Sequence, residues 1–250
     1  MSAVHTYFDN LQALLARTLE TQQEGMETAA RHIADCFRQG GMLYTFGTGH
    51  GHLLALEIFY RAGGMARVCP ILDEKLMLHV SAAKSTLEER DESWLSVLLG
   101  KYPIKAGDVL ISISNSGRNA VPVLLAKAAR ERGAYVIALT SMQHTSQVTS
   151  RNSLNLRLFE TADLVLDNGG VLGDASFRAA DGAMVGPTST SVGAAILQAI
   201  VCRVKEMSLA EGFEADFFKS SNVDGGDEWN DKLIAKYADS IPGQKRRRRC

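Results

Sequence analysis

Short apolar runs alternate with amphipathic stretches along most of this chain, and this alternation most constrains its fold. The run DVLISIS (108–114) is rich in β-branched residues, which is typical of a strand buried on both faces of a parallel sheet. Similar runs at 42–46, 66–72, 134–140 and 162–168 predict four further strands. Because helical patterns separate these runs, we predict an α/β fold with a five-stranded parallel sheet and helices on both faces.

The intervening segments show apolar residues at helical spacing. Helices are expected at 53–62, 122–132, 194–210 and 228–238, with two more between residues 4 and 38, where Gly25 marks either a break or a bend. Residues 74–100 also look helical, and 145–159 look helical or irregular. Pro70 indicates an outer position for the strand at 66–72. Proline has no backbone N–H to donate to a neighbouring strand, so it is found mainly in edge strands.

We expect a single domain over residues 1–240. It comprises an N-terminal helical segment (1–40), an α/β core (41–211) and a C-terminal cap (212–240). Residues 241–250 contain the run KRRRRC, which we interpret as a solvated, disordered tail rather than a nucleic-acid-binding arm.

Composition argues against several classes of protein. With 46% hydrophobic residues and a net charge of −1, the chain has the composition of an ordinary globular protein and no electrostatic case for binding nucleic acid. Its four cysteines lack the spacing of a zinc site or disulfide framework, and no apolar stretch is long enough to span a bilayer. We therefore expect a cytoplasmic protein with no metal, no cofactor, and no membrane or nucleic-acid partner.

Ligands of such sheets bind at the carboxyl ends of the strands, where strand order reverses. The loops at that edge are 47–52, 114–119, 141–146 and 169–190, and three of the four are rich in Gly, Ser, Thr and Asn.

The first loop, GTGHGH (47–52), lies between a predicted strand and a predicted helix. Its glycines let backbone N–H groups approach an anion, and the helix N-terminus adds a partial positive charge. The dinucleotide fingerprint GxGxxG fails because its last position is His52, and no GK[ST] follows. The loop thus predicts an anion-binding site that is neither a dinucleotide-binding loop nor a nucleotide-binding P-loop.

The second loop follows the strand at 108–114 and enters a helix near Pro122. Two hydroxyls and two amides offer several hydrogen-bond donors with one cation, Arg118, which suits a phosphate. Ser and Asn could instead only cap the helix. Beside a second glycine-rich loop we favour the phosphate.

These two stretches carry a family resemblance. FGTGHGHLLA (46–55) followed by ISISNSGRNAVPVLLAKAARERGAYVIALTS (111–141) resembles the sugar isomerase (SIS) domain family of phosphosugar-binding proteins. The chain looks closest to uncharacterised bacterial SIS-domain proteins and next to phosphoheptose isomerase. The resemblance implies a flavodoxin-like three-layer αβα sandwich, a phosphorylated sugar as ligand, and a homodimer or homotetramer with sites near subunit contacts.

The resemblance also implies site residues. The family's first loop commonly ends in a ligand-contacting serine, whereas this chain has Gly51 there. The family lines the sugar side of its pocket with the start of the long apolar helix, although the same residues could serve only as an N-cap. The expected phosphate-binding residues are Thr48, Gly49, His50, Gly51, Ser114, Asn115, Ser116 and Asn119, and the sugar-side residues are Thr188, Ser189 and Thr190.

Isomerising a sugar requires a base that moves a proton next to a carbonyl. Glu57, among apolar neighbours on the first helix, is one candidate, and His79 is the second. Arg61 follows Glu57 at i+4, so a surface ion pair is the alternative reading of Glu57. Enzymes of the SIS family that this chain resembles carry their catalytic glutamate at the position that Arg61 occupies here.

We therefore predict a protein that binds a phosphorylated sugar and isomerises it or catalyses a related proton transfer. The alternative is a non-catalytic phosphosugar sensor. No helix-turn-helix pattern is legible before residue 40, which disfavours a DNA-binding form of such a sensor.

Overall fold

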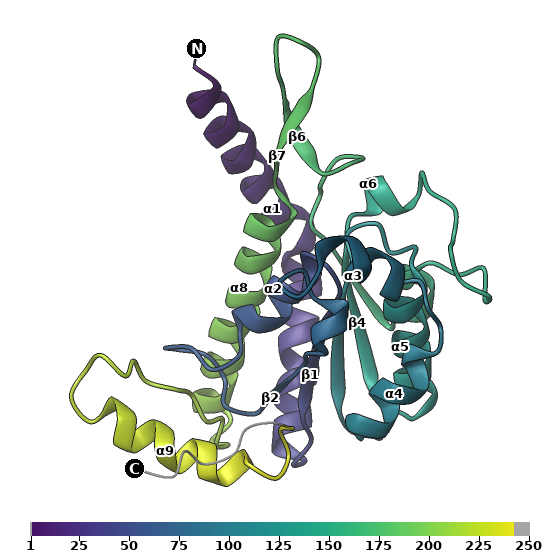
Figure 1. Cartoon of the computed structure of the whole chain (residues 1–250). Coiled ribbons are helices and arrows are strands. Elements are labelled where there is room, and N and C mark those ends of the chain that lie inside the picture. The colour runs from purple at the N-terminus through teal and green to yellow at the C-terminus, as the bar shows by residue number, and fades with distance from the viewer. Residues whose placement is uncertain (1, 243–250) are drawn as a thin grey trace.

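Strand β3 lies at the centre of a five-stranded parallel sheet in the computed structural model, which describes residues 2–242 (Figure 1). The strand order is β2-β1-β3-β4-β5, the flavodoxin-like order, so the predicted fold class is confirmed. Its strands are β1 (Leu43–Gly47), β2 (Val68–Ile71), β3 (Val109–Ile113), β4 (Tyr135–Thr140) and β5 (Leu164–Asp167). The KRRRRC run lies outside the described residues.

Pro70 is in β2, and β2 is an edge strand, as the sequence predicts. Side chains of β3 alternate between two cores: Val109 and Ile111 face one, and Leu110 faces the other. Every residue of β1 and β3 is buried. Polar contact with a ligand is therefore possible only where these strands end.

Helices cover both faces of the sheet. One face carries α1 (Ala3–Arg38), α2 (Gly51–Glu57) and α8 (Ser189–Ala210). The other face carries α4 (Trp94–Lys101), α5 (Ala120–Glu131), α7 (Leu158–Thr161) and α9 (Gly226–Tyr237). No helix within residues 2–242 is both long enough and apolar enough to cross a membrane.

The expected pair of N-terminal helices is a single helix, α1, so the predicted break at Gly25 is wrong. A Cβ at Gly25 would lie 3.0 Å from Leu166 Cδ2, so the glycine lets α1 pass close to β5. One glycine inside a helix costs about 1 kcal/mol, which packing against the sheet offsets.

The segment between β2 and β3 is less regular than the predicted helix. It forms the 3₁₀ helix η1 (Glu74–Leu76) and the short helices α3 (Ala82–Glu88) and α4. The segment 145–159 is mostly irregular between α6 (Met142–Thr145) and α7. Helix α2 also ends at Glu57, earlier than expected.

A two-stranded antiparallel hairpin, β6 (Ala175–Arg178) and β7 (Met184–Pro187), occupies the segment expected to be a ligand-side loop. It projects beyond the sheet beside the N-terminal half of α1 (Figure 1). Tyr7 Oη donates to the Pro187 carbonyl at 2.9 Å, and Asn10 Nδ2 donates to the Ser176 carbonyl at 3.1 Å. Since an isolated hairpin is at best marginally stable in water, these contacts with α1 support it.

The projecting half of α1 keeps apolar side chains in solvent. Val4, Phe8 and Leu19, which helical spacing places on one face, are 67%, 57% and 60% exposed. A helical face of this kind is stabilised by packing against another surface. The exposed stripe is consistent with the homodimer or homotetramer that we predict.

We expect light scattering at micromolar concentration to give the mass of a dimer or tetramer. Phe8→Glu together with Leu19→Glu should lower that mass, because charges would enter a buried interface. Leu209→Glu is the matched control, since Leu209 is 71% exposed at the far end of α8. A monomeric mass for the unmodified protein would contradict the prediction.

Candidate functional site

The adjacent strands β1 and β3 end side by side, with Gly47 in register with Ile113. The chain leaves β1 for α2 on one face of the sheet and leaves β3 for α5 on the other. This is the topological switch point, where open α/β sheets bind their ligands. The two predicted loops therefore meet at the expected place.

The first loop turns sharply. A Cβ at Gly47 would lie 2.4 Å from the carbonyl carbon of Gly51, and a Cβ at Gly51 would lie 2.9 Å from the carbonyl oxygen of Ile113. The loop thus packs against itself and against the end of β3. A serine at position 51 would require one of these backbones to shift, which accounts for the glycine found there.

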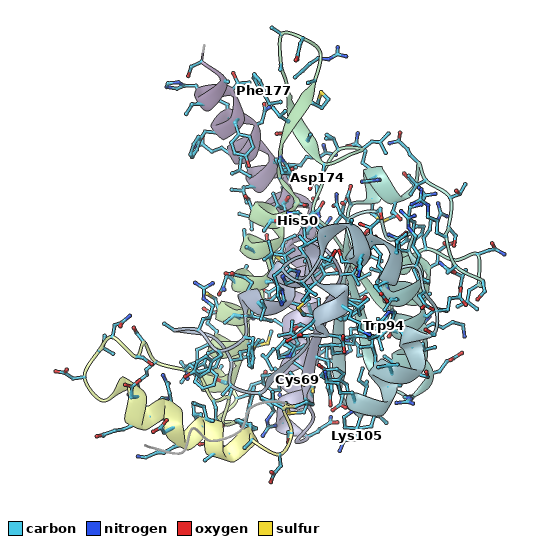
Figure 2. The ribbon with its side chains drawn as sticks, viewed as in Figure 1. His50, Cys69, Trp94, Lys105, Asp174 and Phe177 are labelled. Atoms are coloured by element: carbon cyan, nitrogen blue, oxygen red, sulfur yellow. The ribbon has the colours of Figure 1, made fainter. Side chains whose placement is uncertain are left out.

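Part of the hydrogen-bonding capacity of the first loop is used within the protein. Gly49 N donates to the Leu76 carbonyl at 3.2 Å, and Gly51 N donates to the Thr48 carbonyl at 2.9 Å. The segment that contains η1 therefore lies against this loop. His50 is exposed. It lies toward the same end of the sheet as Asp174, and Lys105 lies at the other end (Figure 2).

His79, a predicted catalytic residue, is exposed on the segment after η1. Its ring centroid lies 6.3 Å from that of His52, which is buried at the start of α2 and hydrogen-bonded to the Gly49 carbonyl. His79 is thus near the first loop. Among residues 2–242, no three His, Cys, Asp or Glu side chains gather closely enough to hold a metal ion.

In the second loop, Ser114 Oγ accepts from Gly117 N at 3.2 Å. The hydroxyl of half-buried Ser116 makes no hydrogen bond within residues 2–242. Asn115 Oδ1 accepts from Asn168 Nδ2 at 3.0 Å, which joins the second loop to the loop after β5. These groups lie at one edge of the sheet and offer hydrogen bonds from uncharged side chains.

Glu89 joins the two loops, and the sequence analysis did not find it. Thr48 Oγ1 donates to Glu89 Oε2 at 2.7 Å, and Asn119 Nδ2 donates to Glu89 Oε1 at 2.7 Å. Its backbone carbonyl accepts from Val121 N, in the first turn of α5, at 3.1 Å. Nothing in the sequence distinguishes Glu89 from its acidic neighbours Glu88 and Glu92, because only tertiary packing brings it to the loops.

The Glu89 carboxyl has a perturbed pKa. Burial raises this pKa, while the hydrogen bond from Thr48 and the charges of Arg90 and Arg151 oppose the rise. Perturbed carboxyl groups of this kind occur preferentially at functional sites.

Glu57, the first predicted catalytic residue, has two partners. Its carboxylate is bonded to Arg61 and accepts from Gln198 Nε2 at 2.9 Å. The i+4 pair considered as the alternative is therefore present. Glu57 lies at the C-terminal end of α2, between that helix and α8.

The predicted sugar-side residues start α8 and contact Asp174. Thr188 N and Ser189 N donate to Asp174 Oδ1 at 3.2 and 2.9 Å, and the Ser189 hydroxyl is bonded to Asp174 Oδ2. Asp174 has φ +69°, a conformation that few residues other than glycine adopt. Thr188 is buried, and Thr190 is half-buried. The helix start is thus capped by a carboxylate from a distant segment.

Comparison with known proteins agrees with this architecture. A family profile described as "SIS domain" matches residues 6–141. The chain belongs to the SIS-domain family. It is also similar to a UPF0309 protein of Listeria innocua, with 40% identity over 240 residues that cover 96% of this chain and 97% of the relative.

Two solved structures share the fold at low sequence identity. Phosphoheptose isomerase from Neisseria gonorrhoeae has a TM-score of 0.51 and 19% identity, covering 82% of this chain and 97% of that one. The NanR protein of Vibrio vulnificus, complexed with ManNAc-6P, has a TM-score of 0.51 and 15% identity, covering 96% of this chain and 69% of that one. At these identities the likeness concerns the fold alone.

We predict that Asp174→Ala destabilises the protein. Losing the cap should cost about 1–2 kcal/mol, and alanine at a positive φ adds about 1 kcal/mol. Urea unfolding followed by circular dichroism measures the change. Asp174→Asn is the control, since asparagine tolerates this φ and keeps an acceptor oxygen; equal stability of both variants and the unmodified protein would refute the capping role.

Proposed function

We propose that this protein binds a phosphorylated sugar at the edge of the sheet, with the phosphate between the loops 47–51 and 114–119. One observation carries the proposal: both loops follow adjacent strands at the switch point, and the second loop leads into the twelve-residue helix α5. The dipole of α5 favours an anion near the start of this helix, although Val121 N already donates to the Glu89 carbonyl and Pro122 has no N–H. Ser116 adds an uncommitted hydroxyl.

The proposed contacts follow the sequence prediction. The phosphate side comprises Thr48, Gly49, His50, Gly51, Ser114, Asn115, Ser116 and Asn119, and the sugar side comprises Thr188, Ser189 and Thr190. Asp174 already accepts hydrogen bonds from the first N–H groups of α8. The sugar would therefore contact this helix beside Asp174 and would not displace the Asp174 carboxylate. Family relatives of the same fold, named as a phosphoheptose isomerase and as a complex with ManNAc-6P, support a phosphosugar as the ligand.

We further propose that the bound sugar undergoes isomerisation or a related proton transfer. This step requires a group that removes a proton beside a carbonyl. Glu57 and His79 are the candidates from the sequence. His79 lies near the first loop and is exposed, whereas the Glu57 carboxylate is bonded to Arg61 and Gln198.

The second candidate function is a phosphosugar sensor that does not turn over its ligand. The Glu57 contacts favour it, since a carboxylate bonded to Arg61 and Gln198 must leave these partners before it can take a proton from a sugar. The two functions share one binding site and differ only in chemistry.

Replacing Ser114 and Ser116 with alanine tests the site. Each change should weaken binding of a phosphosugar by about 1–2 kcal/mol, because a hydrogen bond to a charged group is lost. Calorimetry with a panel of sugar phosphates measures the effect. Ser96→Ala, on the surface of α4, is the control; unchanged affinity in the double variant would show that the phosphate binds elsewhere.

Exchange of solvent deuterium into a bound sugar phosphate, followed by NMR, tests the chemistry. If Glu57 is the base, Glu57→Gln should slow exchange at least about a hundredfold, as loss of a general base typically does. If Glu57 only pairs with Arg61, the change should cost a few tenths of a kcal/mol of stability.

His79→Gln, measured in parallel, assigns the proton transfer to the histidine if it alone slows exchange. Arg61→Gln separates the ion pair from the base, because it removes the partner and leaves the carboxylate. No exchange in the unmodified protein with any phosphosugar of the panel would support the sensor.

A further inference from the structure

The Glu89 carboxylate uses donors that the proposed phosphate would need. Its two oxygens accept from Thr48 Oγ1 and Asn119 Nδ2, both at 2.7 Å, and these two side chains come from the two anion-binding loops. Its backbone carbonyl already accepts from Val121 N at the start of α5. A single residue therefore takes up one donor of each loop and one N–H of the helix start.

Asn119 shows that this arrangement is incomplete. Asn119 is 8% exposed, and no atom of residues 2–242 donates to its buried Oδ1. The amide thus donates to Glu89 while its oxygen has no partner. A buried acceptor without a donor costs about 1–3 kcal/mol, so a state that pairs this oxygen is favoured.

We propose that Glu89 is an internal anion in the phosphate site, and that binding of a phosphate group is coupled to protonation of Glu89. This inference rests on the proposed function and concerns the regulation of that same site. It assigns Glu89 a role different from the one proposed for Glu57.

The coupling follows from charge. A phosphate dianion between the two loops would lie close to the Glu89 carboxylate, and two like charges in a partly buried site raise the pKa of the weaker acid. Burial already raises the pKa of Glu89. The charged groups that act on it are Arg90, which follows it beyond the end of α3, and Arg151, from the segment that packs on the second loop. Both favour the carboxylate and so oppose protonation, whereas burial and the added anion promote it.

Protonation would also rearrange the hydrogen bonds in favour of the ligand. A protonated Glu89 has an O–H that can donate to Asn119 Oδ1 once the amide turns by half a rotation. Asn119 Nδ2 would then occupy the place where Oδ1 now has no partner, while Glu89 Oε2 could still accept from Thr48 Oγ1. The site would thus free one donor, Asn119 Nδ2, from Glu89 and lose one negative charge.

The sign of the pH dependence follows. The ligand raises the pKa of Glu89, so the bound state holds more protons than the free state, and affinity should fall as pH rises. Sulfate is the probe, because it remains a dianion across the neutral range and takes up no proton itself. Calorimetry of sulfate binding in buffers of different ionisation enthalpy measures the protons taken up.

We expect uptake of a fraction of a proton, up to one, per sulfate bound to the unmodified protein. Glu89→Gln should abolish the uptake and bind sulfate at least about tenfold more tightly at about pH 8, because it removes one like charge and can still bond both loops. Glu88→Gln is the matched control: Glu88 accepts from Trp94 Nε1 at 2.8 Å and should behave as the unmodified protein does.

Sulfate binding without proton uptake, and with equal affinity in the Glu89→Gln variant, would overturn the inference and leave the proposed function intact. Absence of sulfate, phosphate and phosphosugar binding in both proteins would overturn the proposed function, and the inference with it. Binding only in the variant would support the inference. If Glu89→Gln does not fold, as judged by circular dichroism, proton uptake by the unmodified protein decides the question alone.

Discussion

The pairing of β1 with β3 is the constraint on which the rest of this structure depends. Both strands are buried along their whole length, so their backbone groups bond only to neighbouring strands. The helices that follow these two strands then lie on opposite faces, α2 on one and α5 on the other. The loops that follow the strands consequently meet at the carboxyl edge, and polar chemistry is confined there.

Polar groups at this edge are largely satisfied by other parts of the same chain. Glu89 binds the two loops, Asp174 caps α8, and the Leu76 carbonyl accepts from the first loop. Two of these acceptors come from the segment between β2 and β3, which has little regular structure. Hydrogen-bond donors at the sheet edge that are buried away from water need acceptors within the protein. The connection between β2 and β3 supplies such acceptors and therefore forms part of the candidate site.

Helix α1 links the core to the projecting part of the molecule. Its C-terminal half packs on the sheet and on α8, with Ala29, Ala30 and Ile33 buried. Its N-terminal half supports the β6–β7 hairpin and exposes Phe8. The same helix thus serves two surfaces, and the strand-side packing explains why it continues through Gly25.

The sequence by itself determined the strands, their parallel arrangement and the two loops, because buried strands and glycine-rich turns leave local patterns in composition and spacing. The run 108–114 predicts β3, and Pro70 predicts the edge position of β2. The hairpin at 175–187 escaped prediction, since its strands are short and mostly exposed. Only the tertiary structure decided which carboxylates face the loops: Glu57 turned to Arg61, while Glu89 reached Thr48 across 41 residues of sequence. The physical reason is that hydrogen bonds between distant segments depend on how the helices pack, and packing is not a local property of sequence.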